Sequence, residues 1–324
     1  MKILGVDIGG TKCAVTFGKE ANNSLQILDK RIFATDVSKT SLHMLNSFFE
    51  ICDEFIAKYG TADSIGISCG GPLDSNSGII ISPPHLPMLH GVPIVKIFKE
   101  RYNIPVFIQN DANACALAEW IYGAGRNCKN MVFLTFGTGL GAGLIFDGKL
   151  YEGTNGNAGE VGHIRLNETG PIGFGKSGSF EGFCSGNGIA QLGYILGKAA
   201  YEHGETPSYY NPDTAPEGIT AKSIALAAIQ EGDATAKEVY RISGENLGKG
   251  LAVIIDILNP QRIIIGSVFA RAKNLLLESC EKVLKEEALG ISLGCCELVS
   301  AELLDNIGDY AAITVGIYGM RKED

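Results

Sequence analysis

The sequence predicts an α/β protein built from two similar domains. Its 324 residues are enough for about two domains, and a hydrophobic content of 45% can fill a core in each. A pattern of strand, glycine-containing turn and returning strand occurs at residues 3–17 and again, about 130 residues later, at residues 131–146. Segments with apolar residues at every third or fourth position indicate helices between and after these repeats. The repeat therefore favours two related halves.

In the first half, short apolar runs predict strands, and apolar spacing with end signals predicts helices. Residues 40–59 carry apolar side chains three and four apart, and Gly60 ends this predicted helix. Pro93 begins a shorter helix, because proline fits the first helical turn. The apolar run 104–108 predicts a strand that passes directly into a helix extending to Trp120. The other predicted strands are 3–6, 13–17, 25–33 and 64–68.

In the second half, strands are predicted on both sides of the second glycine turn, followed by a glycine-rich loop section at 153–186. A long helix is predicted to begin after Asp233, a capping residue, and to end before Pro260. The predicted elements here are strands 131–136, 144–146, 262–265 and 295–299, helices 189–201, 221–230, 234–258, 270–287 and 310–318, and an exposed loop at 204–218.

The composition narrows the class of partner. A net charge of −9, without a block of lysine or arginine, argues against nucleic acid or an anionic membrane and favours small molecules. The nine cysteines are odd in number and never spaced Cys-x-x-Cys, which predicts reduced thiols. The chain starts directly on a strand pattern, and no apolar run reaches about 18 residues. These features predict a cytoplasmic protein with no DNA-binding domain before the first strand.

Both glycine turns have the composition of a phosphate-binding turn. Backbone N–H groups in a turn without bulky side chains can converge on a phosphate, and nearby threonine and lysine add donors. Residues 5–12 nearly match a P-loop, but the threonine and lysine are in reversed order and a strand follows. The turn at 137–142 fits the dinucleotide fingerprint, but a strand follows where that fingerprint needs a helix. A dehydrogenase is therefore disfavoured.

Asp111 is the candidate general base, because it stands where a predicted strand gives way to a helix. Backbone N–H donors at a helix start would hold its carboxylate in one direction and keep it ionised. The alternative interpretation is that Asp111 or Asn110 merely caps the helix.

A second polar cluster contains Glu160, His163 and Glu181. Carboxylates and an imidazole suit a neutral ligand with many hydroxyls, because each can accept from or donate to an O–H group. A solvated loop explains the same residues nearly as well.

Taken together, these motifs resemble the ROK family of sugar kinases, in the actin-like ATPase superfamily that includes the hexokinases. They follow the family's order over nearly the whole chain, and the match is more specific than any single glycine loop. The motifs are Asp7-Ile8-Gly9-Gly10-Thr11-Lys12, Gly70-Gly71-Pro72, Asn110-Asp111-Ala112-Asn113-Ala114, Gly137-Thr138-Gly139-Leu140-Gly141, Gly159-Glu160-Val161-Gly162-His163 and Glu181-Gly182-Phe183-Cys184-Ser185-Gly186.

The resemblance implies a site for ATP, Mg²⁺ and a sugar. Asp111 would take the proton from the sugar hydroxyl, and Asp7 would hold a magnesium-bound water. Both glycine turns would hold the ATP phosphates, and the turn at Gly266 would lie on the adenosine side. The implied cofactor-binding residues are Asp7, Gly9, Gly10, Thr11, Lys12, Gly137, Thr138, Gly139 and Gly266, and the implied sugar-binding residues are Gly71, Asn110, Glu160, His163 and Glu181.

The family's zinc motif is altered in this chain. Ile172, Phe174 and Ser179 replace its three cysteine ligands, while His163 and Glu181 remain. Because zinc sites of this kind need about four ligands, mostly thiolates, no structural zinc is expected. We expect Ile172 and Phe174 to be buried against the sugar-site loop, so that apolar packing keeps His163 and Glu181 in their directions.

Two other segments depart from the family pattern. His85-Leu86-Pro87-Met88-Leu89 stands where relatives often have Asn-Leu-Pro-Gly-Trp near the sugar, and Ser267 stands where a second glycine is common. The first departure bears on which sugar is bound, and the second on the turn beside the nucleotide.

The resemblance also implies the domain arrangement: two similar actin-like, ribonuclease H-like domains with ATP in the cleft between them. The smaller N-terminal domain is predicted to cover residues 1–115 with 305–324 returning to it, and the larger C-terminal domain residues 116–304. Relatives work mostly as dimers or larger assemblies, so a homo-oligomer, most simply a dimer, is implied.

The function predicted from the resemblance is ATP-dependent phosphorylation of a free hexose or N-acetylhexosamine, as in a glucokinase. The first alternative is a regulator that senses a sugar without turning it over, because family repressors share this body. A structural ATPase of the superfamily is a second alternative, but it would leave Glu160, His163 and Glu181 unexplained.

Overall fold

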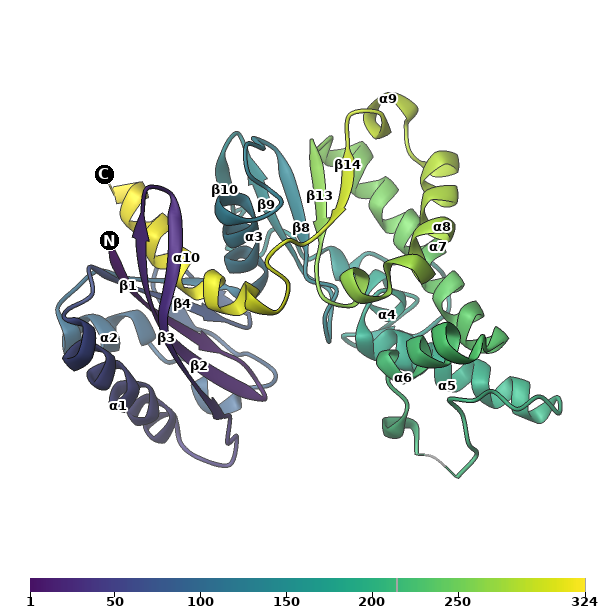
Figure 1. Ribbon diagram of the computed structural model, residues 1–324, viewed down its shortest axis with the longest axis horizontal. Helices are drawn as coiled ribbons and strands as arrows, with labels where there is room; N and C mark the ends of the chain where they lie inside the picture. The colour runs from purple at the N-terminus through teal and green to yellow at the C-terminus, as the bar shows by residue number, and fades with distance from the viewer. Residues whose placement is uncertain (214, 324) are drawn as a thin grey trace. The chain divides into compact units, whose positions relative to one another are not determined.

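The computed structural model describes residues 1–213 and 215–323 (Figure 1). The chain divides into two compact units. Unit 1 comprises Met1–Cys128, Gly143–Ala158 and Glu302–Asp324, and unit 2 comprises Lys129–Ala142 and Gly159–Ala301. The boundary predicted after residue 115 lies inside a helix of unit 1, Asp111–Tyr122.

Unit 1 is built on a five-stranded sheet of order β3-β2-β1-β4-β7. β1 and β2 are antiparallel, as are β2 and β3, whereas β1, β4 and β7 run parallel. Two very short strands, β5 and β6, pair beside it. The bounds are β1 Lys2–Ile8, β2 Lys12–Ala21, β3 Ser24–Ala34, β4 Ser64–Cys69, β5 Leu73–Asp74, β6 Ile79–Ile80 and β7 Val106–Asn110.

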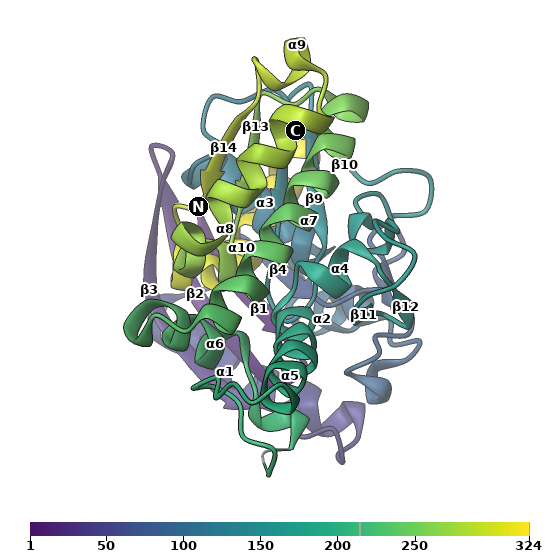
Figure 2. The same ribbon diagram turned by 90° about the vertical axis from the view of Figure 1, so that its right-hand side faces the viewer.

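Helices cover both faces of this sheet (Figures 1 and 2). The side chains of β1 alternate, so that Leu4 and Val6 join the core under α1 (Ser41–Tyr59) and α2 (Ile94–Tyr102). On the other face lies α10 (Ile307–Glu323), which contacts β1, β4, β7 and α3 (Asp111–Tyr122). Gly66 in β4 is required there, because a Cβ would lie 2.0 Å from the carbonyl oxygen of Ala312. The sheet therefore has one apolar core on each face.

Unit 2 contains three parallel strands, in the order β8-β13-β14. They are β8 Met131–Leu134, β13 Arg262–Ile265 and β14 Glu297–Ser300. Every side chain of β8 is buried, as expected for a parallel strand covered on both faces. The antiparallel hairpin of β9 (Ala142–Phe146) and β10 (Lys149–Tyr151) falls mainly in unit 1.

The helices of unit 2 pack beside these strands, and the pair α7–α8 is its most extensive helix contact (Figure 2). Two glycines of α7 let the helices approach: a Cβ at Gly244 would lie 2.5 Å from the carbonyl oxygen of Leu276, and one at Gly248 would lie 2.6 Å from that of Cys280. The bounds are α4 Phe180–Phe183, α5 Gly186–Glu202, α6 Ala221–Leu226, a π-helical turn Ala227–Glu231, α7 Ala234–Leu258, α8 Val268–Glu287 and α9 Gly290–Leu293.

Short elements connect these helices and strands. They are the 3-10 turns η1 Pro87–Leu89, η2 Val161–His163, η3 Pro216–Gly218 and η5 Leu304–Asn306, and the hairpin strands β11 Ile172–Gly173 and β12 Lys176–Ser177. The helix predicted at 221–230 is α6 followed by the π-helical turn, so its last residues are not regular α-helix. Among the residues described, no helix is both long and apolar enough to cross a membrane.

Candidate functional site

In unit 1, three parallel strands end at the same edge of the sheet. Ile8 of β1 pairs with Cys69 of β4, and Cys69 pairs with Asn110 of β7. The first glycine turn, the Gly70-Gly71 turn and Asp111 each follow one of these strand ends. The register therefore gathers all the site residues predicted in the N-terminal part at one sheet edge.

The first glycine turn is tight and its glycines are needed. A Cβ at Gly9 would lie 2.6 Å from the carbonyl oxygen of Lys12, and a Cβ at Gly10 would lie 2.7 Å from Cβ of His85. The hydroxyl of Thr35 donates to the carbonyl oxygen of Gly9 at 2.6 Å. Gly10, Thr11 and Lys12 are exposed at the edge. The turn thus presents a threonine hydroxyl and a lysine ammonium to solvent beside a glycine backbone.

The second turn at this edge leaves its backbone open. A Cβ built on Gly70 or Gly71 would have no heavy atom within 4 Å. Neither glycine is thus required by close packing in unit 1, and a ligand can approach the main chain here.

Asn110 and Asp111 have different roles at the start of α3. Asn110 is the cap of α3, and its side-chain oxygen accepts from the backbone N–H of Asn113 at 2.7 Å. Asp111 is the first helical residue, its Oδ1 accepts from the N–H of Ala112 at 2.8 Å, and its side chain is exposed. Since Asn110 caps the helix, the Asp111 carboxylate can reach a ligand.

The protein around Asp111 perturbs the pKa of its carboxyl. Although its surface is open to solvent, the surrounding protein raises the pKa of its carboxyl, and the backbone donors of Ala112 and Asp111 only partly offset this effect. The backbone donors at the helix start hold the carboxylate as expected, but desolvation has the larger effect on its pKa. A raised pKa makes the carboxylate a better proton acceptor.

Asp7, at the end of β1, is the other perturbed carboxyl of unit 1. Its pKa is raised to about 6: burial has the largest effect, the charges of Asp111 and Asp309 add to the rise, and the Ser68 hydroxyl and Lys12 offset part of it. Asp309 is buried in the first turn of α10 and forms an ion pair with Lys30 at 2.7 Å. A cation beside Asp7 would relieve this repulsion, and carboxylate oxygen is a suitable ligand for Mg²⁺ or its bound water.

The second glycine turn begins at the end of β8 in unit 2. Leu134 of β8 pairs with Ile265 of β13, so Gly266 and Ser267 lie next to it. The N–H of Gly186, at the start of α5, donates to the carbonyl oxygen of Gly137 at 2.7 Å. The N–H of Val268, at the start of α8, donates to that of Phe136 at 3.0 Å. The turn is thereby fixed between the N-terminal ends of two long helices, where anions are favoured.

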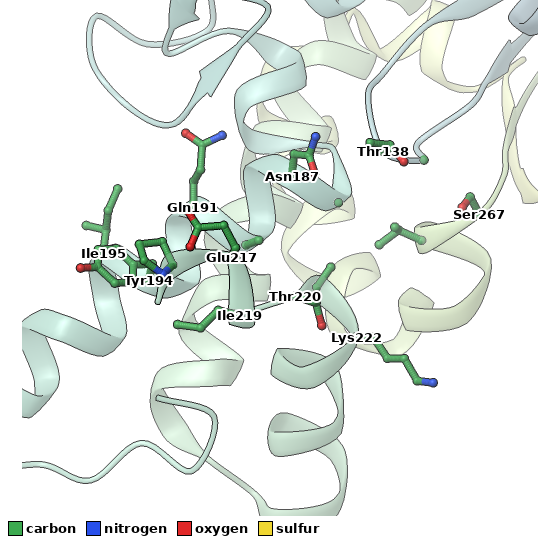
Figure 3. A pocket seen from close by; sticks show the side chains of 16 residues that line it. Thr138, Asn187, Gln191, Tyr194, Ile195, Glu217, Ile219, Thr220, Lys222 and Ser267 are labelled. Atoms are coloured by element: carbon green, nitrogen blue, oxygen red, sulfur yellow. The ribbon is translucent and has the colours of Figure 1, made fainter. Parts of the chain in front are cut away.

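A pocket of about 880 Å³ opens beside this turn within unit 2. Figure 3 shows Thr138 and Ser267 at one end of it and Tyr194 and Ile195 at the other. Its lining also includes Gly137, Gly186, Asn187, Ala190, Gln191, Pro216, Glu217, Ile219, Thr220, Ala221, Lys222 and Val268. One end thus offers backbone donors and helix starts, and the other offers aromatic and aliphatic surface. A nucleotide, with charged phosphates and a flat base, fits this division.

Ser267 takes an unusual backbone conformation in this pocket. Its φ is 50°, in the region that favours glycine. The departure noted in the sequence is therefore a real one: the turn needs a glycine-like conformation, and this chain reaches it with serine.

The hydroxyl-binding candidates of unit 2 lie on two segments that are hydrogen-bonded to the second turn. Glu181, in the first turn of α4, is half-buried and accepts from the backbone N–H of Leu140 at 3.0 Å. Glu160 is exposed and His163 half-buried at the two ends of η2. The N–H of Ala142 donates to the carbonyl oxygen of Gly159 at 3.0 Å, which brings the η2 segment against the turn.

The expected burial of Ile172 and Phe174 is wrong. Their side chains are 54% and 69% exposed, because Ile172 alternates with the buried Gly173 in β11 and Phe174 lies in the two-residue turn of the hairpin. Ser179, in contrast, is fully buried, and its oxygen caps α4 by accepting from the N–H of Gly182 at 3.1 Å. Only Ser179 is thus part of the core.

The predicted site residues form two sets, one in each unit. Asp7, Gly9, Gly10, Thr11, Lys12, Gly71, Asn110 and Asp111 lie in unit 1, and Gly137, Thr138, Gly139, Glu160, His163, Glu181 and Gly266 lie in unit 2. Sequence reasoning missed Ser68 and Asp309 around Asp7 and most of the pocket lining, such as Tyr194 and Lys222. An acidic residue in the first turn of the closing helix was a signal for Asp309.

The fold and these glycine turns define the class of protein: the chain has the actin-like ATPase fold of the ROK kinases. The structure of a ROK family glucokinase from Streptomyces griseus in complex with glucose and AMPPNP matches with a TM-score of 0.78 and 27% identity, covering 98% of this chain and all (100%) of that one. A match to the ROK family spans residues 3–314, and the chain belongs to that family.

Curated relatives include both kinases and regulators. A glucokinase of Thermotoga maritima is 28% identical over 317 residues, which cover 97% of each chain. The DNA-binding transcriptional dual regulator NagC of Escherichia coli K12 is 31% identical over 250 residues, which cover 76% of this chain and 58% of NagC. Family membership alone therefore leaves two functions to compare.

Proposed function

We propose that this chain is an ATP-dependent kinase that phosphorylates a free hexose or N-acetylhexosamine. The observation that carries the proposal is the exposed carboxylate of Asp111, which is free of the capping task and has a raised pKa. Protein relatives named glucokinase support this reading. A protein that only binds a sugar has no need of a base at this position.

In unit 1, Asp111 would accept the proton of the attacking sugar hydroxyl. The amide of Asn110 and the open backbone at Gly71 would bind neighbouring hydroxyls. Thr11 and Lys12, both exposed on the first turn, would donate to phosphate oxygens. Asp7 would accept from water on Mg²⁺, which supplies charge neutralisation to the phosphates when bound.

In unit 2, the backbone at Gly137, Thr138 and Gly139 would donate to phosphates, and the apolar end of the pocket would receive the base of ATP. Glu160, His163 and Glu181 would orient the sugar through its hydroxyls. Because Glu181 also accepts from the N–H of Leu140, this one carboxylate would link the turn to the bound sugar. These residues act by positioning, which is the main source of catalysis in phosphoryl transfer.

The first experiment replaces the base. Asp111→Asn keeps the size of the side chain but removes its basicity, so turnover should fall by about 10²-fold or more. Binding of the sugar, measured by calorimetry, should change by less than about threefold, because hydroxyl contacts remain. Asp53→Asn, which removes a surface ion pair with Arg101, is the control and should leave turnover unchanged. Near-normal turnover of a folded Asp111→Asn protein would contradict the proposal.

The second candidate function is that of a sugar-binding regulator, favoured by the similarity to NagC. The two functions differ in whether ADP is released. A coupled assay of ADP release with glucose, mannose, fructose, allose, N-acetylglucosamine and N-acetylmannosamine distinguishes them. Sugar binding by calorimetry without release of ADP for any of them would favour the regulator.

A homodimer and a cytoplasmic location belong to the same proposal. The homodimer rests on the family resemblance alone, and the location rests on the lack of a long apolar run in the sequence. Light scattering of the purified protein measures the first, and fractionation of cells measures the second.

A further inference from the structure

The loop around His163 raises the question of what orients this side chain. In the family pattern the equivalent positions hold zinc, but the residues here do not fit that metal. Ile172 and Phe174 carry no ligand atom, and the Ser179 oxygen already caps α4. Within residues 1–213 and 215–323, no three or more His, Cys, Asp or Glu side chains are grouped so as to hold a metal ion. Contacts other than a metal bond must therefore orient the His163 side chain.

Backbone pairing and hydrogen bonds from a neighbouring helix hold the hairpin β11–β12 in place. Ile172 pairs with Ser177, and Gly173 pairs with Lys176. The side chain of Gln191 in α5 accepts from the N–H of Ile172 at 3.0 Å and donates to its carbonyl oxygen at 2.9 Å. These bonds anchor the hairpin to α5, so its tip has a defined place.

Two residues of this hairpin contact His163. The rings of Phe174 and His163 meet edge to face, with centroids 5.2 Å apart and planes at 83°. The Lys176 ammonium donates to the carbonyl oxygen of His163 at 2.7 Å. One contact restricts rotation of the imidazole, and the other fixes the backbone that carries it.

The backbone conformation at Phe174 is unfavourable for a bulky residue, which indicates that the ring is kept for a contact that it makes. Phe174 has φ of 43° and the following Gly175 has φ of 76°. A two-residue hairpin turn with both φ values positive favours Asn-Gly, and a bulky residue there is an outlier. The side chain is also 69% exposed, so burial does not offset the strained backbone. The contact with His163 is the remaining reason to keep an aromatic side chain at this position.

We propose that Phe174 is a positioning residue for His163, and that the hairpin β11–β12 performs without metal the task that zinc performs in relatives. The proposal deepens the proposed function, since it concerns how His163 is oriented for a sugar hydroxyl. It names an exposed phenyl ring, and not buried packing, as the orienting group.

The test uses Phe174→Asn, because asparagine suits the turn and keeps the hairpin folded while the ring is lost. The matched control is Ile172→Ala, which truncates another exposed apolar side chain of the same hairpin. Phe174→Tyr is the conservative rescue, because it keeps the ring. The first readout is the NMR spectrum of histidine-labelled protein, with His163 assigned by His163→Gln.

Phe174→Asn should move the ring resonances of His163, because the ring current of Phe174 and the restriction of the imidazole are both lost. Ile172→Ala and Phe174→Tyr should leave these resonances near their original positions. With glucose as the probe sugar, KM should rise about tenfold in Phe174→Asn with little change in kcat, as for a lost orienting contact. Zinc measured by elemental analysis should be far below one per chain in every variant.

Unchanged His163 resonances in Phe174→Asn, equal changes in Ile172→Ala, or stoichiometric zinc would each overturn the proposal. If the parent protein neither binds nor phosphorylates glucose, the proposed function with glucose fails, but the NMR and zinc measurements still decide the role of Phe174. A KM increase shared by Ile172→Ala would also count against it, because the effect would then belong to the hairpin and not to the ring.

Discussion

Burial, together with the nearby charges of Asp111 and Asp309, raises the pKa of Asp7, which gives Asp7 a measurable pH dependence. The pKa of Asp7 is about 6 in the folded chain, compared with about 3.9 for an unfolded aspartate. The raised value means that the protonated form is the more stable one in the fold. Asp7 therefore contributes stability below about pH 4, and this contribution is lost as the pH rises through 6.

Asp7→Asn makes this effect visible. We expect the free energy of unfolding of the parent chain, relative to Asp7→Asn, to fall by an amount on the order of 2 kcal/mol between pH 4 and 7 and then to level off. Denaturant unfolding without Mg²⁺ or nucleotide, at half-unit steps of pH, measures it.

Asp29→Asn is a control of opposite sign. Hydrogen bonds from Lys58 and Tyr59 lower the pKa of Asp29, so its contribution is lost as the pH falls. A relative free energy for Asp7 that stays flat, or that rises between pH 4 and 7, would contradict the prediction.

At the scale of elements, one buried side chain ties the end of α3 to the segment that leads into α10. Glu119 is fully buried, and its carboxylate accepts from the N–H groups of Ala124, Glu302 and Leu303 at 2.8, 3.2 and 2.8 Å. Three backbone donors depend on this carboxylate. The contact joins residues about 180 positions apart in the chain, so no local pattern in the sequence could reveal it.

Glu119→Ala should lower the free energy of unfolding by about 3 kcal/mol, because buried donors lose their acceptor. Glu119→Gln should cost less, since the amide oxygen still accepts. Glu54→Ala breaks an exposed ion pair with Arg31 and should cost less than about 1 kcal/mol. Equal losses for Glu119→Ala and Glu54→Ala, measured by denaturant unfolding, would show that the buried carboxylate does not carry the contact.

Local signals explain why most elements were predictable. Thr40 and Gly60 flank α1 as the sequence indicates, and α7 begins after Asp233 and runs to Leu258 as predicted. These boundaries follow from caps and apolar spacing, which act over a few residues. The pocket of unit 2 was not predictable in the same way, because its lining comes from four separate stretches of the chain. The exposure of Phe174 also depends on the hairpin geometry, which apolar composition does not encode.

At the scale of the whole molecule, unit 1 is assembled from three stretches of the chain. The repeat of strand, glycine turn and strand was visible in the sequence, and the return of the last helix to the first unit followed from the family resemblance. The hairpin β9–β10 lies in the second repeat but falls mainly in unit 1, which the repeat alone did not reveal. The unit to which a segment belongs is decided by its contacts with segments that are distant in the sequence.

The assembly of unit 1 from three separate stretches predicts which of its elements unfold together in local opening. Amide hydrogens of α10 should exchange with the same opening free energy as those of β1 and β4, because α10 packs on both strands. They should differ from those of β14, which precedes α10 closely in sequence but belongs to unit 2. Native-state hydrogen exchange read by mass spectrometry measures each group. Exchange of α10 together with β14, and apart from β1, would contradict the prediction.

The dependence of β1 and β4 on α10 also sets an order of events during synthesis. The strands of unit 1 leave the ribosome first, but the helix that covers one of their faces is made after all of unit 2. Gly5 and Gly66, where α10 packs closely, contribute no side chain to that face. A nascent chain would therefore expose an incomplete sheet for most of its translation time, whereas unit 2 can close once residue 301 has emerged. Protection of that early sheet, by chaperones or by slow collapse, becomes a requirement for making this protein in quantity.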